Sequence, residues 1–313
     1  MEQQTERQHF VPQFYLRNFT NPKGGFFCFD KVEQRRFPAN VRNVAHEHFF
    51  YGIDPSLFPP EAVPPNSYQV IEQTLSQLEG HFSAAIRELL LKGEGEGISL
   101  EQRPILSHFI VLQLLRTREF RNTLRELQTK VAQDIGQRLV HLKEGQGRYR
   151  VKVEFDDSTW PLEQAKLMFD PAKTRELIRI LNNHIWHVGV NETEFPFYTS
   201  DNPIVRQAHI DHPFLGGIGL QSPGVEIAVP LSPRIILILC HRGTFKRNEI
   251  YEGKPIQLVA DNITHYNSLQ VGQSNRYIYC SNDNFALVEQ MCMDEPDLCR
   301  PDRTRIGTGG GSS

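Results

Sequence analysis

Two side chains far apart in the sequence have types that suit acid–base chemistry. His9, between Gln8 and Phe10, is an imidazole that titrates near neutral pH, which suits a general acid or base or a contact to phosphate. Asp201 follows an apolar segment within the run Thr-Ser-Asp-Asn-Pro, where a rigid strand positions a carboxylate for a metal ion or for base catalysis. Both have a simpler interpretation: a turn histidine beside aromatic residues, and an Asx turn before proline.

Two more polar candidates lie one helical turn apart in the segment VLQLLRTREFR. Gln113 and Arg116 face the same way on a helix, beside apolar neighbours, and an arginine there can hold an anionic group with two hydrogen bonds. Arg118 and Arg121 belong to the same run. The alternative is a solvated helix face, with the arginines paired to a carboxylate such as Glu119.

The third pair, Asn267 and Arg276, is nine residues apart, where a predicted helix leads into a strand. We expect these side chains to complete a pocket with Asp201, with Asn267 among the catalytic groups and Arg276 binding substrate. The alternative is that Asn267 caps the helix and Arg276 pairs on the surface.

Glu226 is the candidate for a second metal-binding carboxylate. It lies 25 residues after Asp201 on the next apolar strand, an arrangement in which two carboxylates hold Mg²⁺ or Mn²⁺ in metal-dependent nucleases. Ala228 stands where many nucleases of this kind have a lysine, and this departure favours an ordinary exposed strand glutamate.

Two histidine pairs have a spacing that can bring two imidazoles together on a helix. They are His184 with His187 and His209 with His212. Neither pair has a cysteine or glutamate at a familiar zinc spacing, so the pattern gives little support to a zinc site.

The elements that must position these residues change character along the chain. Segment 8–65 is rich in aromatic residues, with a short strand over 26–31 and a proline-rich loop over 54–65. Apolar residues spaced by three and four predict helices in three stretches, and short β-type runs follow, with one helix between them that starts at Asp261. The helical stretches are 66–93, 99–145 (opened by a Ser99–Gln102 capping box) and 162–190 (a second helix starting at Asp170), and the β-type runs are 194–207, 224–243 and 276–282.

These patterns predict an α+β fold in which a helical middle packs with a β-rich C-terminal half. We expect a single bipartite domain over residues 1–306, composed of the N-terminal segment 8–65, a helical part 66–190 and a β-rich part 191–300. Residues 307–313 have the composition of a flexible tail.

Composition narrows the functional classes. The chain has 313 residues with 34 Lys and Arg against 37 Asp and Glu, a formal charge of −3, which excludes a broad basic field for coating DNA. A hydrophobic fraction of 39% argues against disorder, and no apolar run is long enough to cross a membrane. Five cysteines without a CxxC pair, and no secretory signal at the N-terminus, predict reduced thiols in a cytoplasm.

Several motifs taken together resemble one known family. HFVPQFYLRNF from residue 9, QLLRTREFR from 113, TSDNPI from 199, PLSPR from 230 and the late Asn267 are similar, in order and spacing, to the mostly bacterial family called domain of unknown function 4238. The resemblance spans roughly residues 8–285 and implies no settled activity. It implies that a polar site, if the family has one, includes the residues His9, Arg116, Asp201 and Asn267.

The sequence therefore predicts a cytoplasmic bacterial hydrolase, a metal-dependent nuclease or phosphoesterase that serves in defence or as a toxin. In this hypothesis Asp201 and Glu226 hold the metal, His9 transfers a proton and Arg116 binds phosphate. The alternatives are a non-catalytic module that binds a nucleotide or a protein, and a structural fold whose motifs only maintain packing. Convergence of His9, Arg116, Asp201 and Asn267 on one open cleft is what separates these hypotheses. The sequence leaves the oligomeric state open.

Overall fold

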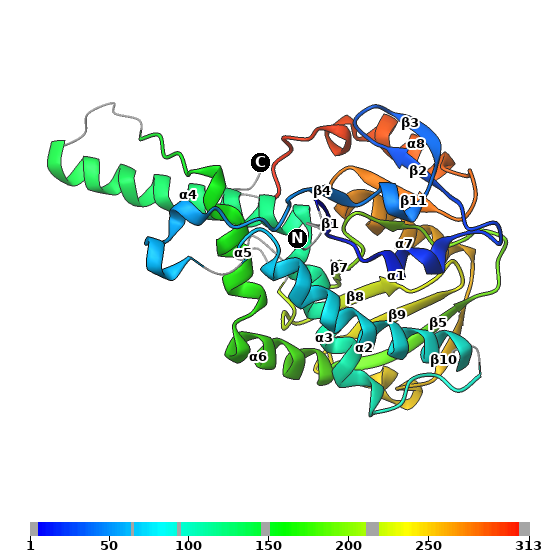
Figure 1. Cartoon of the computed structure of the whole chain (residues 1–313). Helices are drawn as coiled ribbons and strands as arrows, with labels where there is room; N and C mark the ends of the chain where they lie inside the picture. Colours follow the sequence, from blue (N-terminus) through cyan, green and yellow to red (C-terminus); the bar gives the residue numbers. More distant parts are fainter. Residues whose placement is uncertain (1–5, 64–65, 93–94, 145–150, 211–218, 307–313) are drawn as a thin grey trace.

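The computed structural model describes residues 6–63, 66–92, 95–144, 151–210 and 219–306, without the side chains of 141–144. The predicted tail 307–313 and His212 lie outside these residues. The fold is α+β, as predicted, with a helical middle and sheets that are completed by the C-terminal half (Figure 1). Among the described residues, no helix is both long and apolar enough to span a membrane.

The largest sheet has five strands in the order β10-β5-β9-β8-β7. All neighbours in it pair antiparallel except β10 and β5, which run parallel. Its strands are β5 (Ile185–Asn191), β7 (Val205–Ala208), β8 (Val225–Pro230), β9 (Ile235–Cys240) and β10 (Pro255–Leu258).

A second sheet joins the two ends of the chain. Its order is β3-β2-β11-β6, and all neighbours pair antiparallel, so a strand from the N-terminal segment lies beside one from the C-terminal part. Its strands are β2 (Phe26–Asp30), β3 (Arg35–Ala39), β6 (Thr199–Ser200) and β11 (Tyr277–Cys280). Two shorter strands, β1 (Arg7–His9) and β4 (His46–His48), pair separately.

Helices cover both faces of the five-stranded sheet. In Figure 1, α2 and α3 lie in front of it and α7 behind. The front cluster joins α2, α3 and α6 to one face of the sheet, and α7 packs on the other face, while α8 packs on the four-stranded sheet. The helices are α1 (Gln13–Leu16), α2 (Val70–Lys92), α3 (Gln102–Arg116), α4 (Arg118–Glu144), α5 (Trp160–Met168), α6 (Pro171–Asn182), α7 (Ala260–Gln273) and α8 (Ala286–Asp294).

Strand β9 explains why the sheet needs helices on both sides. Its sequence IILILC has no polar residue, and all six of its residues are buried. Because side chains alternate along a strand, Leu237 joins the cluster with α2 and α3, whereas Ile236 and Ile238 join the cluster with α7.

Local sequence signals placed several helix ends correctly. The Ser99–Gln102 capping box is confirmed: the Ser99 N–H donates to Gln102 Oε1 at 3.1 Å, and the Gln102 N–H donates to Ser99 Oγ at 3.3 Å. Asp170 caps α6 by accepting hydrogen bonds from the backbone of Ala172 and Lys173.

Two predicted helical stretches are wrong in detail. The stretch 162–190 ends as strand β5, because its last residues are all buried and pair with β9, which overrides their helical spacing. The run 99–145 is two helices, since Thr117 is extended (ψ 159°) and its hydroxyl accepts a hydrogen bond from the Phe120 N–H at 3.1 Å, which starts α4 in a new direction.

Replacing Leu237 by alanine tests the assignment of β9 as the centre of the core. The side chain is 1% exposed, so we expect Leu237→Ala to lower the free energy of unfolding by about 3 kcal/mol. Leu100→Ala is the control, because Leu100 is 74% exposed and its loss should change stability by less than about 0.5 kcal/mol. Urea unfolding followed by circular dichroism measures both, and equal losses would contradict the assignment.

Candidate functional site

Arg116 ends α3 as a buried structural arginine. Its Nη1 donates to Glu79 at 2.9 Å, its Nη2 to the His9 carbonyl at 2.6 Å and its Nε to the Tyr51 hydroxyl at 3.2 Å. The Tyr51 hydroxyl in turn donates to the Arg116 carbonyl at 3.1 Å. The charges of Tyr51 and Glu79 raise the pKa of Arg116 against the effect of burial. Because all three guanidinium nitrogens are engaged, Arg116 is not placed to bind a phosphate.

Gln113 and His9 are also held inside the fold. Gln113 donates from Nε2 to the Phe10 carbonyl at 3.0 Å. His9 lies 5.1 Å from the ring of His46, and burial, followed by the charges of His46 and Arg116, lowers its pKa to about 4. His9 is therefore neutral at pH 7 and a poor match for proton transfer near neutrality.

Asn267 connects helix α7 to the segment that leads into β6. Its Oδ1 accepts from the Tyr198 N–H at 2.7 Å and its Nδ2 donates to the Pro196 carbonyl at 3.0 Å. A buried amide with both ends occupied in this way orients backbone. The two hydrogen bonds of Asn267 to backbone correspond neither to the catalytic role nor to the helix cap that the sequence suggested.

Glu226 belongs to a different part of the molecule from Asp201. It lies on β8, where it accepts a hydrogen bond from the Tyr266 hydroxyl at 3.1 Å and lies 3.4 Å from His209 Nε2. Burial, followed by the charge of Glu226, raises the pKa of Tyr266. No contact of the described residues joins Glu226 to Asp201, so the donors expected to share a divalent metal ion do not form one set.

The pair His184 and His187 does not form a metal site either, and the pair His209 and His212 includes a residue outside the described ones. His184 precedes β5 and its Nδ1 lies 2.8 Å from the Ile180 carbonyl, whereas His187 lies within the strand and its Nδ1 is 3.2 Å from the Tyr251 carbonyl. Within the part of the chain that the structure describes, no group of three His, Cys, Asp or Glu side chains is placed to hold a metal ion.

Asp201 is the predicted residue with the most distinctive environment. Its carboxylate accepts three backbone N–H groups at the start of β11, from Asn275 at 2.8 Å, Arg276 at 2.7 Å and Tyr277 at 2.9 Å. Burial raises the pKa of Asp201 to about 6, although these N–H groups and Lys31 favour the ionised form. The carboxyl group therefore changes its protonation state close to neutral pH.

Asp201 also lines a cleft of about 310 Å³. The walls come from α4, from the N-terminal segment that contains β4, from the start of β11 and from the C-terminal segment. The polar residues that line it include Asn43, His46, Glu47, Arg118, Asn122, Asp201, Asn275 and Arg276. Of the predicted site residues, the cleft brings together Asp201 and Arg276 alone.

Two arginines of the cleft are oriented by carboxylates, Arg118 by Glu47 and Arg276 by Asp30, with Glu33 a further 3.6 Å from Arg276 Nη2. Arg276 donates from Nε and Nη2 to the two oxygens of Asp30, at 2.8 and 2.6 Å. Arg118, in the first turn of α4, donates from Nη1 to Glu47. Nη1 of Arg276 and both Nε and Nη2 of Arg118 make no hydrogen bond to the described residues. These N–H groups are the donors that the cleft offers to a ligand.

The sequence did not single out His46, Glu47 or Asn122. His46 Nδ1 is buried without a hydrogen-bond partner among the described residues, and burial lowers the pKa of its ring. Arg118 was recognised as part of an arginine run, but only the helix break at Thr117 turns it toward the cleft while Arg116 points into the core. The one available signal was the short His-Glu-His motif in the N-terminal segment.

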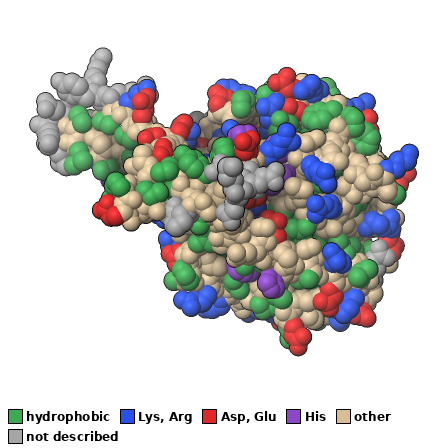
Figure 2. Space-filling model, in the orientation of Figure 1, with side chains coloured by type: hydrophobic (Ala, Val, Ile, Leu, Met, Phe, Trp, Pro, Cys, Tyr) green, Lys and Arg blue, Asp and Glu red, His purple; other side chains and the backbone are tan. Residues whose placement is uncertain are grey.

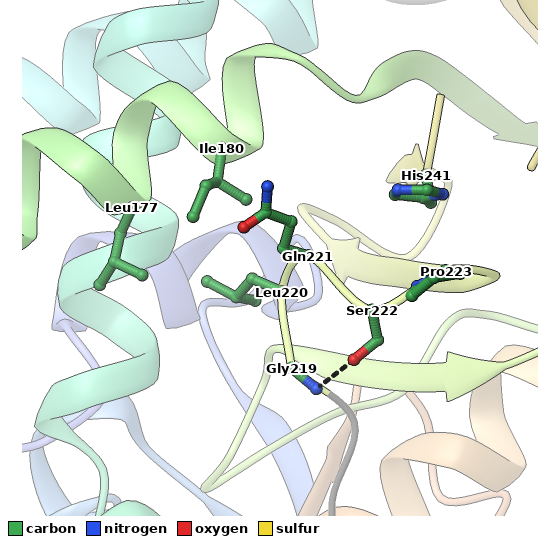
Figure 3. A pocket seen from close by; sticks show the side chains of 8 residues that line it. All are labelled: Leu177, Ile180, Gly219, Leu220, Gln221, Ser222, Pro223 and His241. Carbon is green, nitrogen blue, oxygen red and sulfur yellow. Dashed lines mark hydrogen bonds between the residues drawn. The ribbon is translucent and has the colours of Figure 1, made fainter. Parts of the chain in front are cut away.

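A second hollow, of about 580 Å³, lies between α6 and the loop before β8 (Figure 3). Leu177 and Ile180 line it from the helix, facing Leu220 and Gln221 from the loop, and the Ser222 hydroxyl accepts the Gly219 N–H at 2.9 Å. His241 is the one titratable side chain in its lining. It offers fewer groups for chemistry than the cleft at Asp201.

The pKa of Asp201 can be tested through stability. Because the folded value of about 6 exceeds the ordinary value of 3.8, the folded chain binds more protons between these values, and this carboxyl makes stability fall as pH rises. We expect the unfolding free energy of the natural protein, relative to Asp201→Asn, to decrease from pH 4 to pH 6 and stay constant above pH 7. Urea unfolding measures both proteins. An increase of this relative unfolding free energy from pH 4 to pH 6 would show that folding lowers the pKa of Asp201 instead.

The structural role of Arg116 predicts a large loss of stability on its removal. Arg116→Met leaves the Glu79 carboxylate and the His9 carbonyl without the guanidinium donor, while the Tyr51 hydroxyl keeps its hydrogen bond to the residue-116 carbonyl, so we expect a loss of about 3 kcal/mol. Arg125→Met is the matched control, since Arg125 pairs with Asp157 on the surface and is half exposed. A loss no larger than that of the control, by urea unfolding, would contradict the structural role.

Comparison with known proteins completes the description of the site. No curated protein and no solved structure matches the chain. The profile of one family, described as protein of unknown function (DUF4238), matches residues 7–284, which include every lining residue of the cleft except Pro301. The chain belongs to this family.

Proposed function

We propose that the cleft at Asp201 binds a small phosphate ester and hydrolyses it. The observation that carries this proposal is the pair of oriented arginines, Arg118 and Arg276, beside a carboxyl group whose pKa is near neutral. The proposed site keeps Asp201 and Arg276 from the site that the sequence suggested and leaves out His9, Arg116 and Asn267, whose hydrogen bonds serve the fold.

Phosphate binding rests on the two guanidinium groups. Each is fixed by a carboxylate, Asp30 or Glu47, and keeps N–H donors available. Planar guanidinium groups bind phosphate oxygens through pairs of hydrogen bonds, and an orientation fixed before binding lowers the entropy lost on binding.

Proton transfer rests on Asp201. A carboxyl with a pKa of about 6 is populated in both forms near neutrality, so Asp201 can protonate the leaving oxygen as the ester P–O bond breaks. The water that forms the new P–O bond gives up one proton, which returns Asp201 to its protonated form. No step is assigned to His46, because its Nδ1 is buried. Arg118 and Arg276 stabilise the negative charge on the phosphoryl oxygens in the transition state.

The size of the cleft favours a small substrate over a polynucleotide. A volume of about 310 Å³ is at the lower end of ligand pockets and accommodates a group such as a nucleoside or sugar phosphate. Figure 2 shows basic and acidic side chains together on the visible face, and the formal charge is −3, which gives no extended basic track for nucleic acid.

The proposal assigns no role to Mg²⁺ or Mn²⁺, and the activity assay compares samples with and without these ions. Asp201 reaches the cleft and Glu226 does not, so no step is assigned to a metal ion. A non-catalytic module that binds the same ligands is the second candidate function. It is favoured by the three N–H groups that already occupy the Asp201 carboxylate.

Arg118→Ala tests the site with phosphate compounds. We expect inorganic phosphate and nucleoside monophosphates to bind the natural protein in calorimetry, and Arg118→Ala to weaken binding about tenfold, since it removes a charge-assisted hydrogen bond. Arg125→Ala, on the same helix and outside the cleft lining, should bind as the natural protein does.

Asp201→Asn separates catalysis from binding. Phosphate release from p-nitrophenyl phosphate and nucleoside monophosphates, with and without Mg²⁺ or Mn²⁺, should fall at least a hundredfold while binding persists. Binding without release in the natural protein would identify the non-catalytic module. Absence of both at millimolar ligand would overturn the proposal.

A further inference from the structure

Helix α4 projects from the body of the molecule and carries an apolar stripe. Figure 1 shows its C-terminal half extending beyond the sheets and the other helices, and Figure 2 shows hydrophobic side chains on the visible face of this arm. Leu127, Val131, Ile135 and Leu139 are 47%, 50%, 53% and 54% exposed. Their spacing of four residues places them on one continuous ridge of the helix.

The segments that pack on α4 cover its other faces. A Cβ on Gly136 would lie 2.8 Å from Val151 Cγ1, and the Val151 N–H donates to Gln137 Oε1 at 3.2 Å. On a further face, the backbone of Arg305 donates to Glu126 at 2.9 Å. At 100° of rotation per residue these contacts lie away from the ridge. Four successive half-exposed apolar side chains on a projecting helix are typical of an interface.

We propose that this stripe binds α4 of a second copy of the chain, with the two helices antiparallel across a twofold axis between Val131 and Ile135. Ridges of residues four apart interdigitate when two helices cross at roughly −50°, the commonest packing of helices in globular proteins. In that packing each stripe side chain of one copy lies between two stripe side chains of the other.

In this arrangement the charges beside the stripe of one copy face charges of opposite sign on the other copy. Glu126, Lys130, Asp134 and Arg138 each precede one stripe residue, so their signs run minus, plus, minus, plus along the helix. In an antiparallel second helix the same charges are met in the reverse order, plus, minus, plus, minus. In the interdigitating register Lys130 of one copy therefore lies level with Asp134 of the other, and Glu126 lies level with Arg138.

This alternation favours a second copy over other partners. Within one chain the same charges already pair, Lys130 with Glu126 at 2.6 Å and Arg138 with Asp134 at 2.9 Å. Glu126 also accepts the N–H groups of Arg305 and Ile306, and Lys130 donates to the Ile306 carbonyl at 2.7 Å. Antiparallel association adds a charged partner of opposite sign to each of the four side chains. A nucleic acid or an anionic membrane would meet Glu126 and Asp134 with like charge, whereas a second copy is complementary at all four positions.

Analytical ultracentrifugation of the full chain tests the proposal. We expect a reversible dimer of twice the 36.1 kDa chain mass, with a dissociation constant on the order of 10 µM. Val131→Gln with Ile135→Gln keeps good helix formers at exposed positions and should leave a monomer at 100 µM. Unchanged circular dichroism of this variant verifies that the loss is one of association. A natural protein that is monomeric at 100 µM, or a dimer that persists in this variant, would overturn the proposal.

A charge reversal tests the antiparallel register. Asp134→Lys with Arg138→Glu keeps an ion pair along the helix but places like charges opposite one another in the dimer, so the dissociation constant should rise at least tenfold at low salt and less at 0.5 M salt. Glu88→Lys with Lys92→Glu, an exposed pair of the same spacing on α2, is the control and should dimerise normally. Equal dissociation constants for the two reversals would refute the register.

Discussion

The acceptance of three backbone N–H groups by the Asp201 carboxylate is the interaction on which the site and much of the surrounding fold depend. These hydrogen bonds fix the turn between α7 and β11. Strand β11 in turn pairs with both β6 and β2. Arg276 belongs to the same turn and reaches Asp30 at the end of β2. One buried acid thus connects the beginning and the end of the chain, because an unpartnered carboxylate would be costly inside the fold.

That interaction also explains the chemistry available at the cleft. Burial opposes the ionised carboxylate, whereas the N–H groups and Lys31 favour it, and the balance leaves the pKa of Asp201 near 6. The same turn places Arg276 in the lining, so the structural and proposed catalytic roles share residues. A substitution in this turn acts on the fold and on the cleft together, which is why the two roles have to be measured separately.

Two neighbouring arginines, Arg116 and Arg118, have different roles because α3 ends between them. Arg116 points into the core, where its guanidinium group donates hydrogen bonds to three acceptors. Arg118 instead starts α4 and lines the cleft. Thr117 makes the difference, because its extended backbone and capping hydroxyl end one helix and begin the next. The new direction also carries α4 out of the body, where its apolar ridge meets solvent.

The α+β class, most helices and the strand of six apolar residues follow from the sequence alone, since spacing, capping residues and β-branched runs are local properties. The sequence also selected Asp201 and Arg276. It assigned chemistry to His9, Arg116 and Asn267, which the structure uses to satisfy backbone and buried charge, and it did not select His46 or Asn122. Which polar side chains face solvent-accessible space and which end in a core depends on contacts between residues far apart in the chain. Local sequence carries no record of those contacts, so only the tertiary structure shows which of the predicted residues line the cleft.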